Sequence, residues 1–271
     1  IFIHFQNGKY NFIGQKGDTY PQQKPLNDNA ISISMDAQML LNGISRSLFA
    51  TADDELRPVM NGVYFDIHTD DLTFVASDGH KLVRLRNLAV KSPERASFIL
   101  PKKPANLLKN LLAKESEQVL IKFDDNNAYI TCTNFEMVCR LIEGRYPNYN
   151  SVIPQENPFK VTIDRISFLN ALKRVSVFSN PASSLVKLHL KDSLITVSAQ
   201  DIDFSTSAEE RIVCQFDGTE LSIGFKATYL IEILGNISSE EVVLELADPS
   251  RAGLIVPSEN DEDEDLSLIH I

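Results

Sequence analysis

The side chains that could do chemistry in this 271-residue sequence are scattered rather than grouped. Its five histidines show neither a His-x-His nor a His-Glu-x-x-His spacing, so they do not predict a zinc site. The sequence also lacks a Gly-x-Ser-x-Gly turn, a glycine-rich phosphate-binding loop and a dinucleotide-binding fingerprint. We therefore expect no enzyme activity, no metal ion and no cofactor.

Two pairs of polar residues come closest to a catalytic arrangement. Asp78 and His80 could serve as an acid and a base, but no third side chain nearby in the sequence completes such a site. Asp201 and Asp203 follow a strand-like run, where a pair of aspartates more often shapes a turn than binds a metal. An enzyme that uses Asp78 and His80 is the less favoured alternative.

The cysteines and the apolar runs indicate the cellular compartment of the protein. Cys132, Cys139 and Cys214 lie in strand-like runs without a Cys-x-x-Cys spacing, which favours buried thiols in a reducing cytoplasm. No apolar run approaches the ~20 residues that a membrane helix needs. The first residues do not form a basic segment followed by an apolar one, so no secretory signal is predicted. We expect a cytoplasmic protein without a membrane partner.

One stretch joins a strand to a polar corner. Leu72–Ser77 alternates as a β-strand does, and Leu82 begins another strand-like run. Between them, Asp78 can accept backbone hydrogen bonds and Gly79 tolerates a positive φ, which suits a tight turn. A hairpin turn explains this pattern, but a corner that exposes His80 beside an apolar residue would also suit docking.

The elements around this corner occur twice along the chain. The segment Ile33–Asn42 resembles Val161–Asn170, and in both a strand-like run is followed by an aspartate and an apolar-periodic segment. Further on, Phe98–Lys102 matches Gly224–Lys226. Both copies show the order strand, helix, strands, helix, strands. This repeat predicts modules of about 120 residues, a typical domain size.

The repeat divides the chain into three parts. We expect residues 31–150 and 151–271 to be nearly complete modules, and residues 1–30 to be the last strands of a preceding module. The pairs Tyr20-Pro21 and Tyr146-Pro147 would close their modules, because proline holds the residue before it in an extended conformation.

Each full module is predicted to contain two amphipathic helices. An aspartate precedes the first helix of each module, at a position that suits an N-cap. The remaining segments alternate between apolar and polar residues, so the predicted fold class is α+β, with two helices packed on antiparallel β-sheets in each module. The helices are expected near Asp36–Phe49, Lys102–Ala113, Asp164–Phe178 and Lys226–Ile237.

The charge distribution suggests a surface that could face a polyanion. The net charge of −11 argues against binding nucleic acid over the whole surface, and six acidic residues lie in the run Glu259–Asp265. Three of the four predicted helices nevertheless carry lysine or arginine opposite their apolar stripes. Solvated helix faces explain this pattern, but a phosphate-facing surface is the interpretation that the acidic remainder favours.

Three further motifs follow one another along the chain: Ser77–Leu82, Leu100–Lys103 and Glu143–Pro147. Together they resemble the bacterial DNA sliding clamp, the β subunit of the replicative polymerase. The resemblance covers nearly the whole chain, with residues 1–30 similar to the end of the first clamp domain, 31–150 to the second and 151–271 to the third. A two-domain clamp of the trimeric eukaryotic and archaeal kind is the alternative, and the corner and residues 1–30 argue against it.

This resemblance implies a ring around duplex DNA that serves as a processivity factor and is a head-to-tail homodimer in its full-length form. The DNA would be held topologically, so loose phosphate contacts would suffice. By position, Phe178 would lie in the subunit interface. The inward-facing cations would be Arg46, Arg57, Lys102, Lys103, Arg140 and Arg174.

The resemblance also implies a hydrophobic groove between two domains that captures short linear peptides from polymerase, clamp loader and repair proteins. The matching positions are Met60, Ser77, Gly79, His80, Lys81, Leu82, Pro147, Val152, Lys226, Tyr229 and Ala252. The family ends in a strand with a Met-Pro-Met-like tail, whereas this sequence ends in Leu266–Ile271. We expect this atypical end to leave the last sheet incomplete and the groove weakened.

Overall fold

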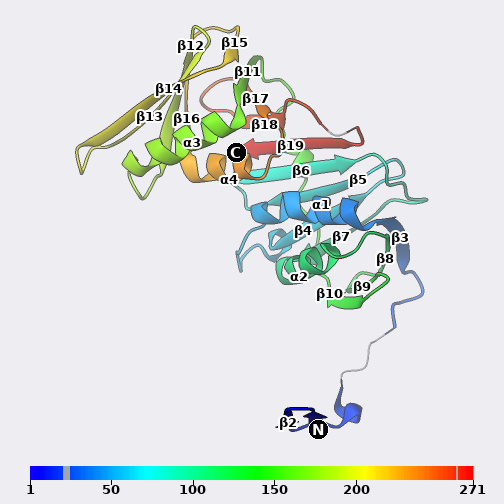
Figure 1. Cartoon of the computed structure of the whole chain (residues 1–271). Helices are drawn as coiled ribbons and strands as arrows, with labels where there is room; N and C mark the ends of the chain where they lie inside the picture. The colour runs from blue at the N-terminus through cyan, green and yellow to red at the C-terminus, as the bar shows by residue number, and fades with distance from the viewer. Residues whose placement is uncertain (21–24, 261, 271) are drawn as a thin grey trace.

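The computed structural model describes residues 1–20, 25–260 and 262–270, and it has the predicted α+β architecture (Figure 1). Residues 31–150 are called the first module below and residues 151–270 the second module. The helices are α1 (Ala37–Ser47), α2 (Lys102–Leu112), α3 (Arg165–Val175) and α4 (Ala227–Gly235). They coincide with the four expected segments.

The strands form antiparallel sheets in both modules. Those before and within the first module are β1 (Phe2–Phe5), β2 (Gly8–Asn11), β3 (Ile31–Asp36), β4 (Gly62–Ile67), β5 (Leu72–Ser77), β6 (Lys81–Asn87), β7 (Ala96–Pro101), β8 (Gln118–Phe123), β9 (Asn127–Thr131) and β10 (Glu136–Arg140). Those of the second module are β11 (Phe159–Asp164), β12 (Leu185–Lys191), β13 (Leu194–Asp201), β14 (Thr206–Val213), β15 (Gln215–Phe216), β16 (Leu221–Lys226), β17 (Glu241–Leu246), β18 (Gly253–Pro257) and β19 (Glu264–His270).

Capping by aspartate starts the first helix of each module. The Asp36 carboxylate accepts hydrogen bonds from the backbone N–H groups of Gln38 and Met39 at 2.8 and 3.3 Å. The Asp164 carboxylate accepts one from the N–H of Ser167 at 2.7 Å. Each cap satisfies a donor that has no partner within the helix, and replacing such a cap by alanine typically costs about 1 kcal/mol.

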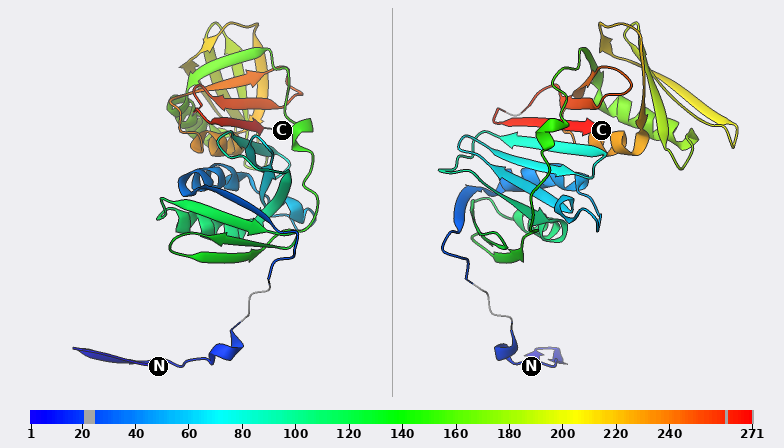
Figure 2. Two further views of the ribbon diagram at one scale, coloured as in Figure 1. Left: turned by 90° about the vertical axis from the view of Figure 1, so that its right-hand side faces the viewer. Right: turned by 180° about the vertical axis from the view of Figure 1, so that it is seen from behind.

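One sheet runs through both modules. Its strand order is β15-β11-β17-β18-β19-β6-β5-β4-β7, so the modules join where β19 pairs with β6. The other sheets of the two modules have the orders β10-β9-β8-β3 and β14-β13-β12-β16. Figure 2 shows the two modules side by side with their shared sheet continuous between them.

The pairing of β19 corrects the expectation of an incomplete last sheet. Leu266, Leu268 and Ile269 are at most 1% exposed, and β19 lies between β18 and β6. Although this segment departs from the expected tail, its alternation of apolar and polar residues fits a strand that is paired on both sides. Ile271 lies outside the described residues.

Two apolar clusters occupy the two faces of the shared sheet. The main core lies between the sheets and the helices, and contains Phe65 and Phe74 of the first module and Phe168 of the second. A smaller cluster contains Val75, Leu82 and other residues from both modules. Because successive side chains of a strand point to opposite faces, this smaller cluster lies on the face away from the helices.

The hairpin β1–β2 is separate from these sheets and has mostly exposed side chains (Figures 1 and 2). The assignment of residues 1–30 to a preceding module stays a prediction. The proposed closing pair at Tyr20 includes Pro21, which lies outside the described residues. Among the described helices, none is long and apolar enough to span a bilayer.

Candidate binding groove between the modules

The polar corner between β5 and β6 is fixed by its own side chains. The Ser77 hydroxyl accepts a hydrogen bond from the N–H of Gly79 at 3.1 Å and donates one to the carbonyl of Lys81 at 2.9 Å. The Asp78 carboxylate accepts from the N–H groups of His80 and Lys81, both at 2.9 Å. Gly79 has a φ of +88°, a backbone conformation that favours glycine.

Lys81 connects this corner to the second module. Its ammonium group is 2.6 Å from the Asp78 carboxylate and 3.1 Å from that of Glu232 on α4, and the residue is only 6% exposed. Burial alone would lower the pKa of Lys81, but hydrogen bonds to the two carboxylates outweigh it and raise that pKa. Burial raises the pKa of Asp78, but the Lys81 ammonium and two backbone N–H groups lower it overall.

Aromatic rings from three elements meet beside Lys81. The His80 ring stacks on that of Tyr229 with centroids 5.8 Å apart, and the His270 ring of β19 lies 5.4 Å from the same tyrosine. The ammonium groups of Lys81 and Lys226 each lie 4.9 Å from the Tyr229 centroid, within the range of a cation–π contact. Burial lowers the pKa of His270 to about 4.

An apolar floor lies next to this polar end of the site. Both modules contribute side chains to it. Residues 141–158, which join β10 to β11 and are called the connecting segment below, cover part of it. Its buried members are Val75, Leu82, Ile99, Tyr146, Tyr149, Ile153, Leu254 and Ile269. Apolar side chains flanked by oriented polar groups are typical of sites that hold an extended peptide.

The connecting segment makes ring contacts and hydrogen bonds with both modules. Tyr146 stacks on Tyr64 with centroids 4.6 Å apart, and the Tyr149 hydroxyl donates a 2.7 Å hydrogen bond to the Asp66 carboxylate. Further along, the Asn157 side chain donates to the carbonyls of Glu245 and Ala252. The segment therefore forms a rigid side of the groove.

The segment also bounds a pocket of about 380 Å³. Val152, which is 40% exposed, lines this pocket together with Ala252 and Arg251 of the second module. An apolar side chain that entered here would contact both modules at once.

The groove residues expected from the sequence fall into three sets. Ser77, Gly79, His80, Lys81 and Leu82 meet Lys226 and Tyr229 at the junction, as described above. Pro147 and Val152 belong to the connecting segment. Ala252, between β17 and β18, lines the same pocket as Val152. Met60 is buried, whereas its neighbour Val59 packs against the apolar floor.

Several members of the groove were not expected. The sequence reasoning did not single out Tyr149, Ile153, Leu254 or Ile269, because nothing in a single apolar residue shows which face of a shared sheet it will line. The end of the chain supplies Ile269 and His270 to this site, and the expectation of a weakened groove stays a prediction.

The expected DNA-facing cations lie in different surroundings. Arg46 bonds Glu264 at 3.2 Å and Ser238 at 3.2 Å across the module junction. Arg57 is not on a helix face: its guanidinium donates to Asp54 and to the carbonyl of Asp78, which places it at the groove corner. Of the remaining four, Lys103 is exposed, and three bond carboxylates. These pairs are Lys102–Asp53, Arg140–Glu143 and Arg174–Glu210.

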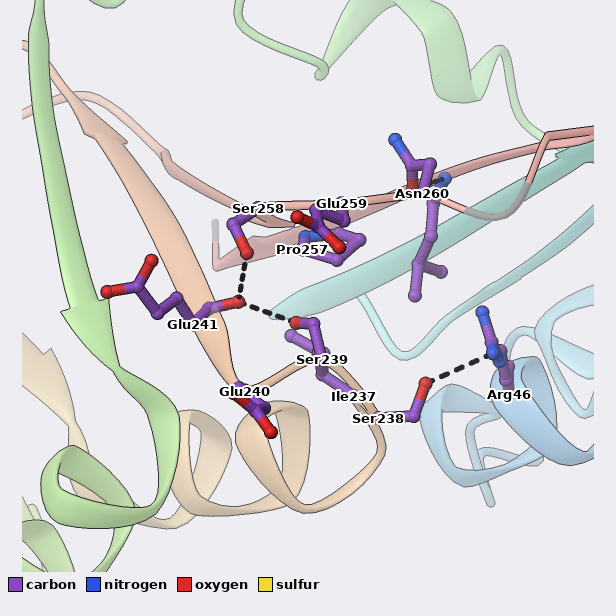
Figure 3. A pocket seen from close by; sticks show the side chains of 11 residues that line it. Arg46, Ile237, Ser238, Ser239, Glu240, Glu241, Pro257, Ser258, Glu259 and Asn260 are labelled. Carbon is purple, nitrogen blue, oxygen red and sulfur yellow. Dashed lines mark hydrogen bonds between the residues drawn. The ribbon is translucent and has the colours of Figure 1, made fainter.

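A second pocket of about 510 Å³ lies at the junction near the end of α1 (Figure 3). Arg46 approaches it from the first module, and Glu240, Glu241 and Glu259 line it from the second. The hydroxyls of Ser239 and Ser258 both donate hydrogen bonds to the backbone carbonyl of Glu241. Among the described residues, no group of three or more metal-ligating side chains is present.

Known proteins share this architecture. The family description "DNA polymerase III beta subunit, central domain" matches residues 34–148, and "DNA polymerase III beta subunit, C-terminal domain" matches residues 150–269. The "Beta sliding clamp" of Pseudomonas aeruginosa is 28% identical over 234 residues, which cover 86% of this chain and 64% of the relative. That of Synechococcus elongatus is 27% identical over 248 residues, covering 89% and 65% respectively.

Solved structures agree with these matches. A DnaN sliding clamp from Pseudomonas aeruginosa, bound to griselimycin, aligns with a TM-score of 0.94 at 25% identity over 100% of this chain and 72% of that one. A DNA polymerase sliding clamp from Bacillus subtilis gives 0.89 at 25% identity, covering 100% and 71%. The chain spans slightly less than two-thirds of the length of the curated relatives above, 64–65%.

Proposed function

The chain belongs to the DNA polymerase III beta subunit family, and we propose that it forms part of a sliding clamp, a ring that encircles duplex DNA and tethers the polymerase as a processivity factor. The arrangement of side chains at the module junction is the observation that carries this proposal. It combines an apolar floor with a rigid polar corner, as a site for extended peptides requires.

The proposed partners are those that use such a groove: polymerase, clamp loader and repair proteins that carry short linear peptides. One or two apolar side chains of the peptide would enter the space near Leu82 and Val152. The exposed backbone and side chains of the corner would bond the peptide main chain. Asp78 and His80 have binding and structural roles here rather than catalytic ones, because the Asp78 carboxylate is already occupied by Lys81.

The proposal treats residues 1–30 as the end of a first clamp domain, 31–150 as the central domain and 151–271 as the C-terminal domain. The matching families are those of a beta subunit, which favours the bacterial kind of clamp over a trimeric two-domain one. In the full-length form the ring would be a cytoplasmic homodimer. Phe178, which is 40% exposed, would lie in its interface.

Peptide binding tests the groove directly. We expect a fluorescent peptide with two apolar anchors to bind the chain, and Val152→Asp to weaken that binding at least tenfold because a charge would enter an apolar site. Leu88→Asp is the matched control, since Leu88 is also 40% exposed and does not line the groove. Equal binding by wild type and Val152→Asp would contradict the groove assignment.

Retention on DNA tests the ring. The full-length form, loaded on plasmid, should remain on circular DNA and leave linearised DNA from its ends, because the hold is topological rather than adhesive. Equal retention on both forms of DNA would exclude a sliding ring.

A further inference from the structure

The polar end of the proposed groove holds one lysine that is already paired and one that is not. The Lys81 ammonium group bonds the carboxylates of Asp78 and Glu232. The Lys226 ammonium group lies over the same Tyr229 ring, and among the described residues no carboxylate forms an ion pair with it. The cation–π contact with the ring keeps this unpaired charge beside the proposed groove.

The charge of Lys226 acts within the site. Burial is the main reason why the pKa of His270 is lowered, and the charges of His80 and Lys226 lower that pKa further. A peptide that covered Lys226 would remove water from an unpaired ammonium group, which is costly. A carboxylate on the peptide would offset this cost, because it would replace the lost hydration by an ion pair.

Lys226 also lies where the site meets the outer face of another sheet. It ends β16, and the register places it directly opposite Leu185 of β12. Ile223 and Phe225 of β16 are buried, so the alternation of the strand places Gly224 and Lys226 on its other face. Because Gly224 has no side chain, the backbone of β16 is open next to Lys226.

The neighbouring strand β12 continues this surface with an apolar residue and a second lysine. Buried and exposed residues alternate along β12, so Leu185 and Lys187 share its outer face, and Leu185 is 54% exposed. Within the described part of the chain, no carboxylate pairs with Lys187. Lys191, further along the same face, differs in this respect because it bonds Glu220 at 3.1 Å.

The outer face is hollowed beside these residues. A pocket of about 550 Å³ is lined by Leu185 and Lys187 and by residues of β13 and β14. Glu209 lines its far side, two strands away from Lys187, and bonds Arg211 at 3.1 Å. An exposed leucine next to two unpaired lysines is complementary to a ligand that carries carboxylates around an apolar side chain.

We propose that the binding site continues from Tyr229 over β16 onto β12, and that this extension takes an acidic segment of the partner peptide. Carboxylates of the segment would bond Lys226 and Lys187, and an apolar side chain would lie on Leu185. The extension rests on the proposed function, because it lengthens the proposed groove. It adds the chemistry of the residues that flank the apolar anchors of the peptide.

Fluorescence anisotropy with three peptides tests the extension. All three carry the same two leucine anchors, and they are lengthened, at either end in turn, by Glu-Glu-Leu-Glu, by Gln-Gln-Leu-Gln or by Glu-Glu-Ser-Glu. The chain should bind the first peptide about five- to tenfold more tightly than the second, with the third in between. The preference should shrink as salt is added, because these charges are partly exposed.

Variants assign this preference to the two lysines. Lys226→Gln and Lys187→Gln should each weaken binding of the acidic peptide about threefold and leave binding of the neutral peptide unchanged. The double variant should bind both peptides equally. Lys191→Gln is the matched control, since Lys191 lies on the same strand and face but is bonded to Glu220, so this variant should keep the full preference.

Equal binding of the acidic and neutral peptides by the unaltered chain would overturn the extension. So would an equal loss for both peptides in Lys226→Gln, which would indicate a structural role for this lysine. Val152→Asp separates these failures from a failure of the proposed groove: it should weaken binding of all three peptides whether or not the extension exists. Binding of none of the peptides would contradict both proposals.

Discussion

At the scale of single residues, the Ser77–Lys81 corner shapes a turn and also joins the modules. Its sequence occurs in only one copy of the repeat, and the structure gives an architectural reason: Lys81 of the corner bonds Glu232 of the second module. In the second module β14 takes the place that β6 has in the first, and it ends its sheet, so no further module pairs with it among the described residues. A junction that occurs once therefore explains part of the difference between the two copies, and His80 stays exposed for the proposed peptide.

Gly79→Ala should damage this corner. The new methyl group would need a φ of +88°, and its carbon would lie 2.7 Å from a guanidinium nitrogen of Arg57. We expect a loss of about 1–2 kcal/mol in the free energy of unfolding and weaker peptide binding. Denaturant titration and peptide anisotropy measure these two effects. Gly17→Ala, where nothing lies within 4 Å, should change neither.

His270 should make stability depend on pH. Its folded pKa of about 4 lies below the unfolded value of 6.5, so the unfolded state binds a proton more readily. The contribution of His270 to the free energy of unfolding is fully present above pH 6.5. It should be lost as the pH falls from 6.5 to 4, which lowers that free energy by roughly 2 kcal/mol after allowing for partial exposure.

Denaturant titrations at pH 7, 5.5 and 4.5 would measure this loss. In His270→Gln, the part of the decline that lies between pH 6.5 and 4 should shrink, while the decline at lower pH, where carboxylates such as Asp78 are protonated, should persist. An unchanged profile in His270→Gln would assign the loss to other groups.

At the scale of elements, the helices and the repeat followed from local patterns. The capping aspartates and apolar stripes predicted α1–α4, because those signals depend on neighbours within one or two turns. The prediction of an incomplete last sheet was wrong, because residues 264–270 form a strand whose partner, β6, lies in another module. A strand that completes a distant sheet has no local signal beyond its alternation.

Leu268→Ala should show how much β19 contributes. Leu268 is fully buried between the modules, so we expect a loss of about 2–4 kcal/mol in unfolding free energy and looser association of the modules. Limited proteolysis of the connecting segment would detect the loosening. Leu190→Ala, fully buried within β12, should destabilise the protein to a similar degree without exposing that segment first.

At the scale of the whole molecule, the modules form one body through a shared sheet. The apolar floor of the proposed groove lies on one face of that sheet, and the helices cover the other. In the proposed ring, the helix face would meet DNA. Of the expected cations, exposed Lys103 is the most direct candidate, whereas Arg46 and Arg57 bond protein groups at the junction and at the corner.

Lys103→Ala should therefore weaken the contact of the full-length form with DNA. Removing one phosphate contact should lower the slope of log affinity against log salt by about 1, uniformly across DNA sequences. Anisotropy with duplex DNA at several salt concentrations would measure the slope. Lys91→Ala, on an exposed loop of the same module, should leave the slope unchanged.

The sequence by itself determined the repeat, the α+β class, the helices and the polar corner, because spacing and turn chemistry are local. Only the tertiary structure decided which strands join the modules, which apolar residues line the groove and which cations are already paired. These depend on contacts between residues far apart in the chain: Lys81 with Glu232, Arg46 with Glu264, and β19 with β6. No periodicity within one segment encodes such partners.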